Sequence, residues 1–146
     1  MLSLEQLKKL SPMPSDTFLM EEDTGAELVD TYDKIIETLR EELRNTIIEP
    51  DLEKRVVQTL CNSFGLDSGF GIYWGALHLI EQLNPILWGP IVQASAVAGG
   101  DSCRYWCCFI LARRRDRDDL PIFVTLLTDN SAIIRIQALK ALVMLS

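Results

Sequence analysis

The second half of the chain repeats itself with a period of 31 residues. Residues 73–80 align with 104–111 and then with 135–142. One position of each copy holds a small residue, namely Ala76, Cys107 and Ala138. Periods of roughly 20 to 50 residues indicate stacked helix pairs, because each pair has an apolar face that only a neighbouring pair covers. We therefore predict an all-α protein built from helix pairs.

The final copy resembles a known repeat family. Residues 129–142 begin with Asp129, place Arg135 after an aliphatic residue and close on Ala141 and Leu142, and so resemble the second helix of a HEAT-type repeat. Residues 120–127 resemble the first helix of that repeat. The resemblance implies an α-solenoid, a right-handed stack of antiparallel helix pairs, for which we expect about six to eight helices.

A separate acidic layer is predicted before the repeats. Its first helix begins with a capping box, from Thr24 to Glu27, and carries an apolar stripe as far as Ile47. Pro50 suits the start of a second helix, and Gly65 is expected to end that helix in the left-handed conformation. The predicted organisation is a single domain over residues 1–146, with an N-terminal helix and loop (1–23), an acidic helix pair (24–66) and two to three HEAT-like units (69–146).

The charge is concentrated in this acidic layer. Residues 1–53 hold 14 acids and 5 bases, whereas residues 54–146 hold 7 acids and 9 bases. The net charge of −7 argues against nucleic-acid binding, which needs clustered bases, and favours a basic protein partner. Acids on the polar side of the first helix are more typical of a solvated or partner-binding face than of a catalytic pair. The predicted partner-binding residues are Asp30, Asp33, Glu37, Glu41 and Glu42.

The four cysteines, Cys61, Cys103, Cys107 and Cys108, lie in apolar, helix-like surroundings without the loop spacing of a disulfide scaffold. We expect them to be reduced and the protein to be cytoplasmic. Four ligands with zinc-site spacing are not visible, so no metal or cofactor is predicted. The 19 uncharged residues from Gln82 to Gly100 are interrupted by prolines and glycines, which favours two buried helices over a membrane span.

Two features near the C-terminus leave alternatives open. The run from Arg113 to Asp119 places bases at the end of one helix and acids at the start of the next, which favours a structural role through the helix dipoles over an anion-binding patch. The last helix has little polar face, because most of its residues are apolar: Ile133, Ile134, Ile136, Leu139, Leu142, Val143, Met144 and Leu145. This predicts a homodimer through the C-terminal helix, or another partner there.

These features favour a protein-binding module without enzymatic activity. A compact acidic domain without a catalytic constellation fits an immunity protein that neutralises a basic bacterial toxin, of the contact-dependent or polymorphic type, by direct binding. The alternative is a HEAT-like scaffold or regulatory adaptor that binds a peptide or protein. An enzyme ranks third: the repeats are similar to those of bilin lyases and some DNA-repair glycosylases, but a glycosylase needs a basic groove.

Overall fold

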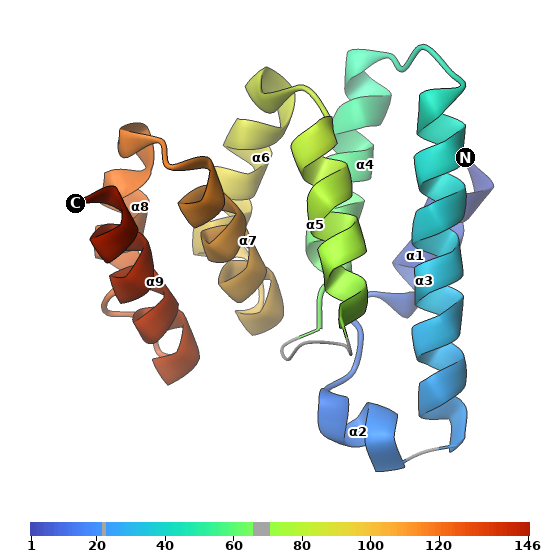
Figure 1. Cartoon of the computed structure of the whole chain (residues 1–146), viewed down its shortest axis with the longest axis horizontal. Helices are drawn as coiled ribbons and strands as arrows, with labels where there is room; N and C mark the ends of the chain where they lie inside the picture. Colours follow the sequence, from blue (N-terminus) through green and yellow to red (C-terminus); the bar gives the residue numbers. More distant parts are fainter. Residues whose placement is uncertain (22, 66–70) are drawn as a thin grey trace.

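The computed structural model is all-helical (Figure 1). It describes residues 1–21, 23–65 and 71–146, and no strand occurs within these ranges. Their nine α-helices exceed the expected six to eight, partly because a short helix forms where only a loop was predicted before residue 23. The helices are α1 (Leu2–Leu10), α2 (Asp16–Glu21), α3 (Asp23–Arg44), α4 (Pro50–Ser63), α5 (Ile72–Gln82), α6 (Pro85–Ala98), α7 (Asp101–Arg114), the 3₁₀-helix η2 (Arg117–Asp119), α8 (Leu120–Leu126) and α9 (Ala132–Leu145).

The helices lie in two rows. In Figure 1, α3, α5, α7 and α9 form the row nearer the viewer, with α1, α4, α6 and α8 behind them. Helix α4 contacts α1 and α6 within the rear row, while α7 contacts α9 within the front row. Contacts between the rows join α1 to α3, α4 to α5, α6 to α7 and α8 to α9. Buried apolar residues from Leu4 to Leu145 form one continuous core cluster.

The 31-residue period corresponds to real structural equivalence in the second half. Helices α7 and α9 are both 14 residues long, and their first residues, Asp101 and Ala132, are one period apart. The recurring small residues Ala76, Cys107 and Ala138 are all fully buried. The same shift aligns residues 67–69 with 98–100 and 129–131, which predicts a loop in each copy, but residues 67–69 lie outside the described residues.

The first helices of the repeat units are less alike than the sequence suggested. The 31-residue shift also aligns Pro90 with Pro121. Pro121 lies in the first turn of α8, whereas Pro90 lies inside α6, which begins at Pro85. The uncharged stretch therefore forms one long helix with its flanking turns, and the prediction of two helices there was wrong. The N–H that Pro90 lacks would have bonded to the carbonyl of Ile86, a residue that is 80% exposed. No helix in the described ranges is long and apolar enough to cross a membrane.

The acidic layer forms two helices, but its boundaries differ from the prediction. Helix α3 starts at Asp23, so Thr24 lies inside the helix instead of capping it. Helix α3 ends at Arg44, and Ile47 is 99% exposed, so the apolar stripe stops one turn early. Gly65 is not left-handed. It is required for space, because a Cβ there would lie 2.2 Å from the Tyr73 hydroxyl oxygen.

An aromatic cluster joins the acidic layer to the repeats. The Tyr73 ring packs edge-on against Tyr32 and Phe64, with ring centroids 5.5 and 5.9 Å away. The Trp106 ring stacks on Phe64 at 5.3 Å, and its Nε1 donates a 2.9 Å hydrogen bond to the carbonyl of Gly65. These contacts fix α3, α5, α7 and the end of α4 relative to one another.

Candidate functional site

Four of the five predicted partner-binding residues lie along one face of α3. Asp30, Asp33, Glu37 and Glu41, called the acidic row below, are spaced three or four residues apart and all are exposed. Residues at this spacing are neighbours on a helix surface, so their carboxylates form one line. The structure thus groups four of the predicted acids on an open surface at one end of the molecule (Figure 1).

Two members of the acidic row pair with bases on the same helix. Asp30 lies 2.9 Å from the ammonium of Lys34, and this contact raises the pKa of Lys34. Glu37 pairs with Arg40, whose second guanidinium nitrogen also donates to the carbonyl of Gly75. The pairs involving these exposed acids are weak, so a partner's cation can displace them.

Glu42 does not belong to the acidic row. Its carboxylate accepts a 3.0 Å hydrogen bond from Ser3, whose side chain is buried in the contact between α1 and α3. Glu42 thus contacts α1 and is only partly exposed, unlike the four acids of the acidic row. Its role in partner binding stays a prediction.

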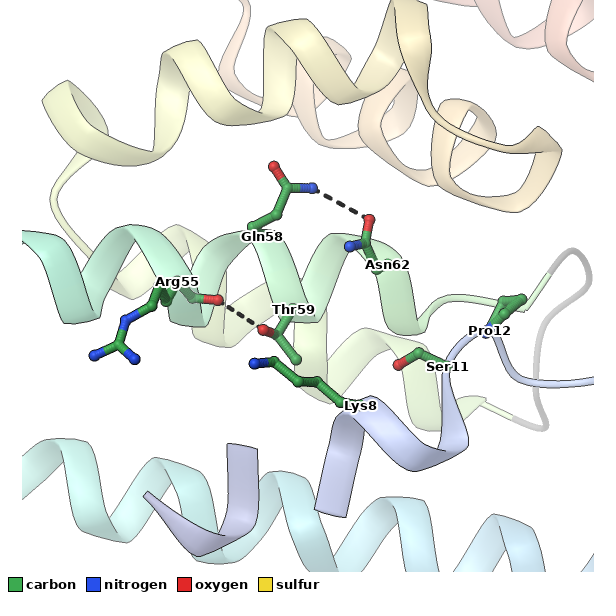
Figure 2. Close-up of a pocket in the computed structure, with 7 residues that line it drawn as sticks. All are labelled: Lys8, Ser11, Pro12, Arg55, Gln58, Thr59 and Asn62. Atoms are coloured by element: carbon green, nitrogen blue, oxygen red, sulfur yellow. Dashed lines mark hydrogen bonds between the residues drawn. The ribbon is translucent and has the colours of Figure 1, made fainter. Parts of the chain in front are cut away.

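A pocket of about 450 Å³ lies where α1 and the following turn meet α4 (Figure 2). All the residues that line it except Pro12 have polar or cationic side chains, whose carbon stems also border the pocket. They are Lys8, Ser11, Pro12, Arg55, Gln58, Thr59 and Asn62. In Figure 2 the Lys8 ammonium and the Arg55 guanidinium lie on the same side of the pocket. No carboxylate of the described residues lines this pocket.

The hydrogen-bond network of the pocket fixes which atoms face its interior. Gln58 donates from its amide nitrogen to Asn62 Oδ1 at 3.2 Å and to Ser95 Oγ at 3.3 Å. Because its oxygen is occupied, Asn62 presents its NH₂ group as a donor, and Figure 2 shows that nitrogen turned toward Thr59. The hydroxyl of Thr59 donates to the carbonyl of Arg55 at 2.8 Å, which leaves the Thr59 oxygen as an acceptor.

The cysteines are all buried and free, as expected. The sulfur atoms of Cys103 and Cys107 are 3.8 Å apart. A hydrogen bond from Cys107 lowers the pKa of Cys103, while hydrogen bonds to Cys103 and Cys61 raise the pKa of Cys107. Cys103 also lines a second pocket, of about 310 Å³, which shares Pro12 and Asn62 with the first. Among the described residues, no group of three or more His, Cys, Asp or Glu is arranged to hold a metal ion.

Three residues of the charged run from Arg113 to Asp119 join separate elements of the fold. Arg113 and Arg114 lie in the last turn of α7, and Arg113 bonds to Glu81 of α5 at 3.0 and 3.1 Å. Arg114 contacts the fully buried carboxylate of Asp119 twice at 2.7 Å, and Gln93 donates to the same carboxylate at 2.8 Å. Arg113, Arg114 and Asp119 therefore have a structural role through direct ion pairs and hydrogen bonds. The contribution of the helix dipoles stays a prediction.

The cationic pocket was missed from the sequence. Lys8 and Arg55 each lie on the polar side of an amphipathic helix, and nothing in the local pattern indicates that α1 packs against α4. The sequence offers one indication of the pocket. Basic residues are rare in the first 53 residues, and Lys8 is one of only 5 there.

The chain was compared with protein-family models, with curated proteins and with solved structures, and none of the three comparisons found a match.

Proposed function

We propose that the chain is a non-enzymatic protein-binding module with the architecture of a HEAT-like solenoid, in which the acidic row on α3 contacts a basic partner. The observation that carries the proposal is the exposure of Asp30, Asp33, Glu37 and Glu41 along one face of a helix at the end of the molecule. A line of carboxylates attracts cations over distances of about a Debye length and speeds association with a basic surface. The reduced cysteines fit a cytoplasmic location.

Within this proposal, the best-fitting role is that of an immunity protein that neutralises a basic bacterial toxin by direct binding. A net charge of −7 with a concentrated acidic face suits a basic toxin domain such as a nuclease. The alternative role is a scaffold or regulatory adaptor, whose peptide or protein partner would bind to a groove between helices. The two roles differ in salt dependence, because binding through exposed charges weakens strongly with ionic strength.

The experiment is affinity capture from the native source with three forms of the protein: wild type, Asp33→Lys/Glu41→Lys, and a control with Asp118→Lys at the other end of the chain. We expect wild type and control to retain the same basic protein, and the α3 variant to lose it. The affinity for the purified partner should fall at least tenfold between 50 and 200 mM salt, as a rough expectation for several exposed ion pairs. Retention of the partner by the α3 variant, with no effect of salt, would exclude the acidic row and favour the adaptor.

The partner proposed for α9 is a second copy of the chain. Ile136, Leu139 and Val143 are each more than half exposed and follow one another at helical spacing, with Ile133 extending the line. Packing this line against its symmetry mate would bury apolar area that is otherwise in contact with water. Sedimentation equilibrium should show a dimer that Leu139→Lys converts to a monomer. A wild-type monomer at every concentration tested would exclude this assembly.

A further inference from the structure

The donors that line the pocket between α1 and α4 are those that recognise an oxyanion. The Arg55 guanidinium can bind two oxygens of a phosphate or carboxylate at once, and Lys8 supplies a second positive charge. Asn62 adds a neutral N–H donor whose direction is fixed by the bond from Gln58 to its oxygen. Three donors from two helices therefore border one concave site.

Two hydroxyl oxygens in the pocket can accept hydrogen bonds, so a ligand that fits the pocket also carries hydrogen-bond donors. Ser11 donates its hydroxyl hydrogen to the carbonyl of Leu7 at 2.8 Å, and Thr59 donates its own to the carbonyl of Arg55. Both hydroxyl oxygens are therefore left to accept hydrogen bonds from a ligand. A molecule that satisfies donors and acceptors together carries an oxyanion and hydroxyl groups.

The size and charge of the site favour a small ligand of this kind. The volume of about 450 Å³ exceeds that of a bare phosphate and lies within the range of roughly 300 to 1,000 Å³ typical of small-molecule pockets. Glu5 of α1 lies 3.4 Å from Lys8 in an exposed pair. Such a pair is weak, so Lys8 can turn from Glu5 to a ligand.

We propose that this pocket binds a small polyhydroxylated organic anion, of the class of sugar phosphates and hydroxycarboxylates, through Lys8, Arg55 and Asn62. The site is separate from the acidic row on α3 and has the opposite charge. Binding here therefore stands or falls independently of the proposed protein partner.

The test is isothermal titration calorimetry of the full chain at low salt with four probes: glucose 6-phosphate, citrate, inorganic phosphate and glucose. We expect saturable binding of glucose 6-phosphate or citrate, weaker binding of inorganic phosphate, and none of glucose. The better of the first two identifies the anion as phosphate or carboxylate. Failure of both to saturate at millimolar concentration, or equal binding of uncharged glucose, would overturn the proposal.

Variants distinguish this pocket from diffuse charge attraction. Lys8→Gln and Arg55→Gln should each weaken binding about tenfold, as expected for loss of a charged hydrogen-bond donor. The matched control is Lys54→Gln, which removes the same charge from an adjacent exposed residue that does not line the pocket. Glu5→Gln should strengthen binding, since it frees Lys8. Equal weakening by Lys54→Gln and Arg55→Gln would show that no defined site exists here.

Discussion

Ion pairs at the two ends of the molecule differ in what they connect. In α1 and α3, Lys8 pairs with Glu5, Lys34 with Asp30 and Arg40 with Glu37, each within one helix. In the second half, Arg104 pairs with Asp129, Arg113 with Glu81 and Arg114 with Asp119, each between elements. Three ion pairs in the second half therefore join separate elements, although Arg104 also pairs with Asp101 within α7. The ion pairs of α3 stay within that helix.

One contact between helices in the N-terminal half is made by two uncharged groups. Tyr32 lies in the aromatic cluster, and its hydroxyl shares a 2.7 Å hydrogen bond with Ser63 at the end of α4. Burial raises the pKa of Tyr32, so this contact is uncharged throughout the ordinary pH range. From this comparison we expect that the four acids of the acidic row can be replaced without loss of the fold, while Asp119 and Asp129 cannot.

The largest expected effect is at Asp119. Substitution Asp119→Ala leaves Arg114 and Gln93 without the buried carboxylate that both contact. Removing one member of a buried ion pair typically costs about 3 to 5 kcal/mol. Urea denaturation should show a loss of this size, against less than about 0.5 kcal/mol for the exposed neighbour in Asp118→Ala. Equal losses of stability in Asp119→Ala and Asp118→Ala would show that the buried carboxylate contributes no more to the fold than an exposed one.

The second prediction concerns pH. Two bonds from Arg104, at 2.9 and 3.1 Å, lower the pKa of Asp129, which is only 9% exposed. The folded protein therefore binds this proton less readily than the unfolded chain, so the stabilisation is complete above the ordinary pKa of about 3.9 and is lost as pH falls through the folded value. Asp129→Asn should cost about 2 kcal/mol at pH 7, roughly the value of a charged hydrogen bond.

The control for this prediction is the pH series itself. The difference in unfolding free energy between wild type and Asp129→Asn should shrink as pH falls below about 4, because the wild-type carboxyl then becomes neutral as well. A difference that stays constant from pH 7 to pH 3 would mean that the pair with Arg104 contributes nothing ionic.

A smaller effect is expected from Tyr32→Phe. The hydroxyl is lost, but Ser63 keeps its 2.7 Å hydrogen bond to the carbonyl of Leu60, so no donor is stranded. The cost should be about 1 kcal/mol, as for one neutral hydrogen bond. Because neither hydroxyl is charged, the loss should be the same at pH 4 and pH 7. A loss of stability that grows with pH would contradict the conclusion that the bond between Tyr32 and Ser63 is uncharged.

The repeats were predictable because their signal is local and periodic. Ala76, Cys107 and Ala138 mark the buried side of successive helices without any knowledge of their partners. The end of α3 was not predictable, because the apolar spacing continues to Ile47 although the helix stops at Arg44 without a proline or glycine to signal it. The apolar period describes a face and says little about where the helix ends.

The polar sites show where local patterns are insufficient. The acidic row could be predicted because four carboxylates on one helix need only helical spacing. The contact of Glu42 with Ser3 could not be predicted, because it depends on the packing of α1 against α3. The pocket with Lys8 and Arg55 likewise depends on the packing of α1 against α4, and the bond from Gln93 to Asp119 depends on α6 approaching α8. Each of these needs a contact between segments distant in sequence.

The smallest expected effect on stability is at Glu37. Substitution Glu37→Gln removes an exposed ion pair within α3, and Arg40 keeps its bond to the carbonyl of Gly75. Exposed pairs of this kind contribute about 0.5 kcal/mol or less, so the urea midpoint should barely change. A loss of more than about 1 kcal/mol would show that α3 uses its charge as α7 does. If the free energy of unfolding is unchanged while the affinity for a basic partner falls, the Glu37 carboxylate contributes to binding and not to the fold. Glu37 would then differ from Asp119, whose carboxylate contributes to the fold.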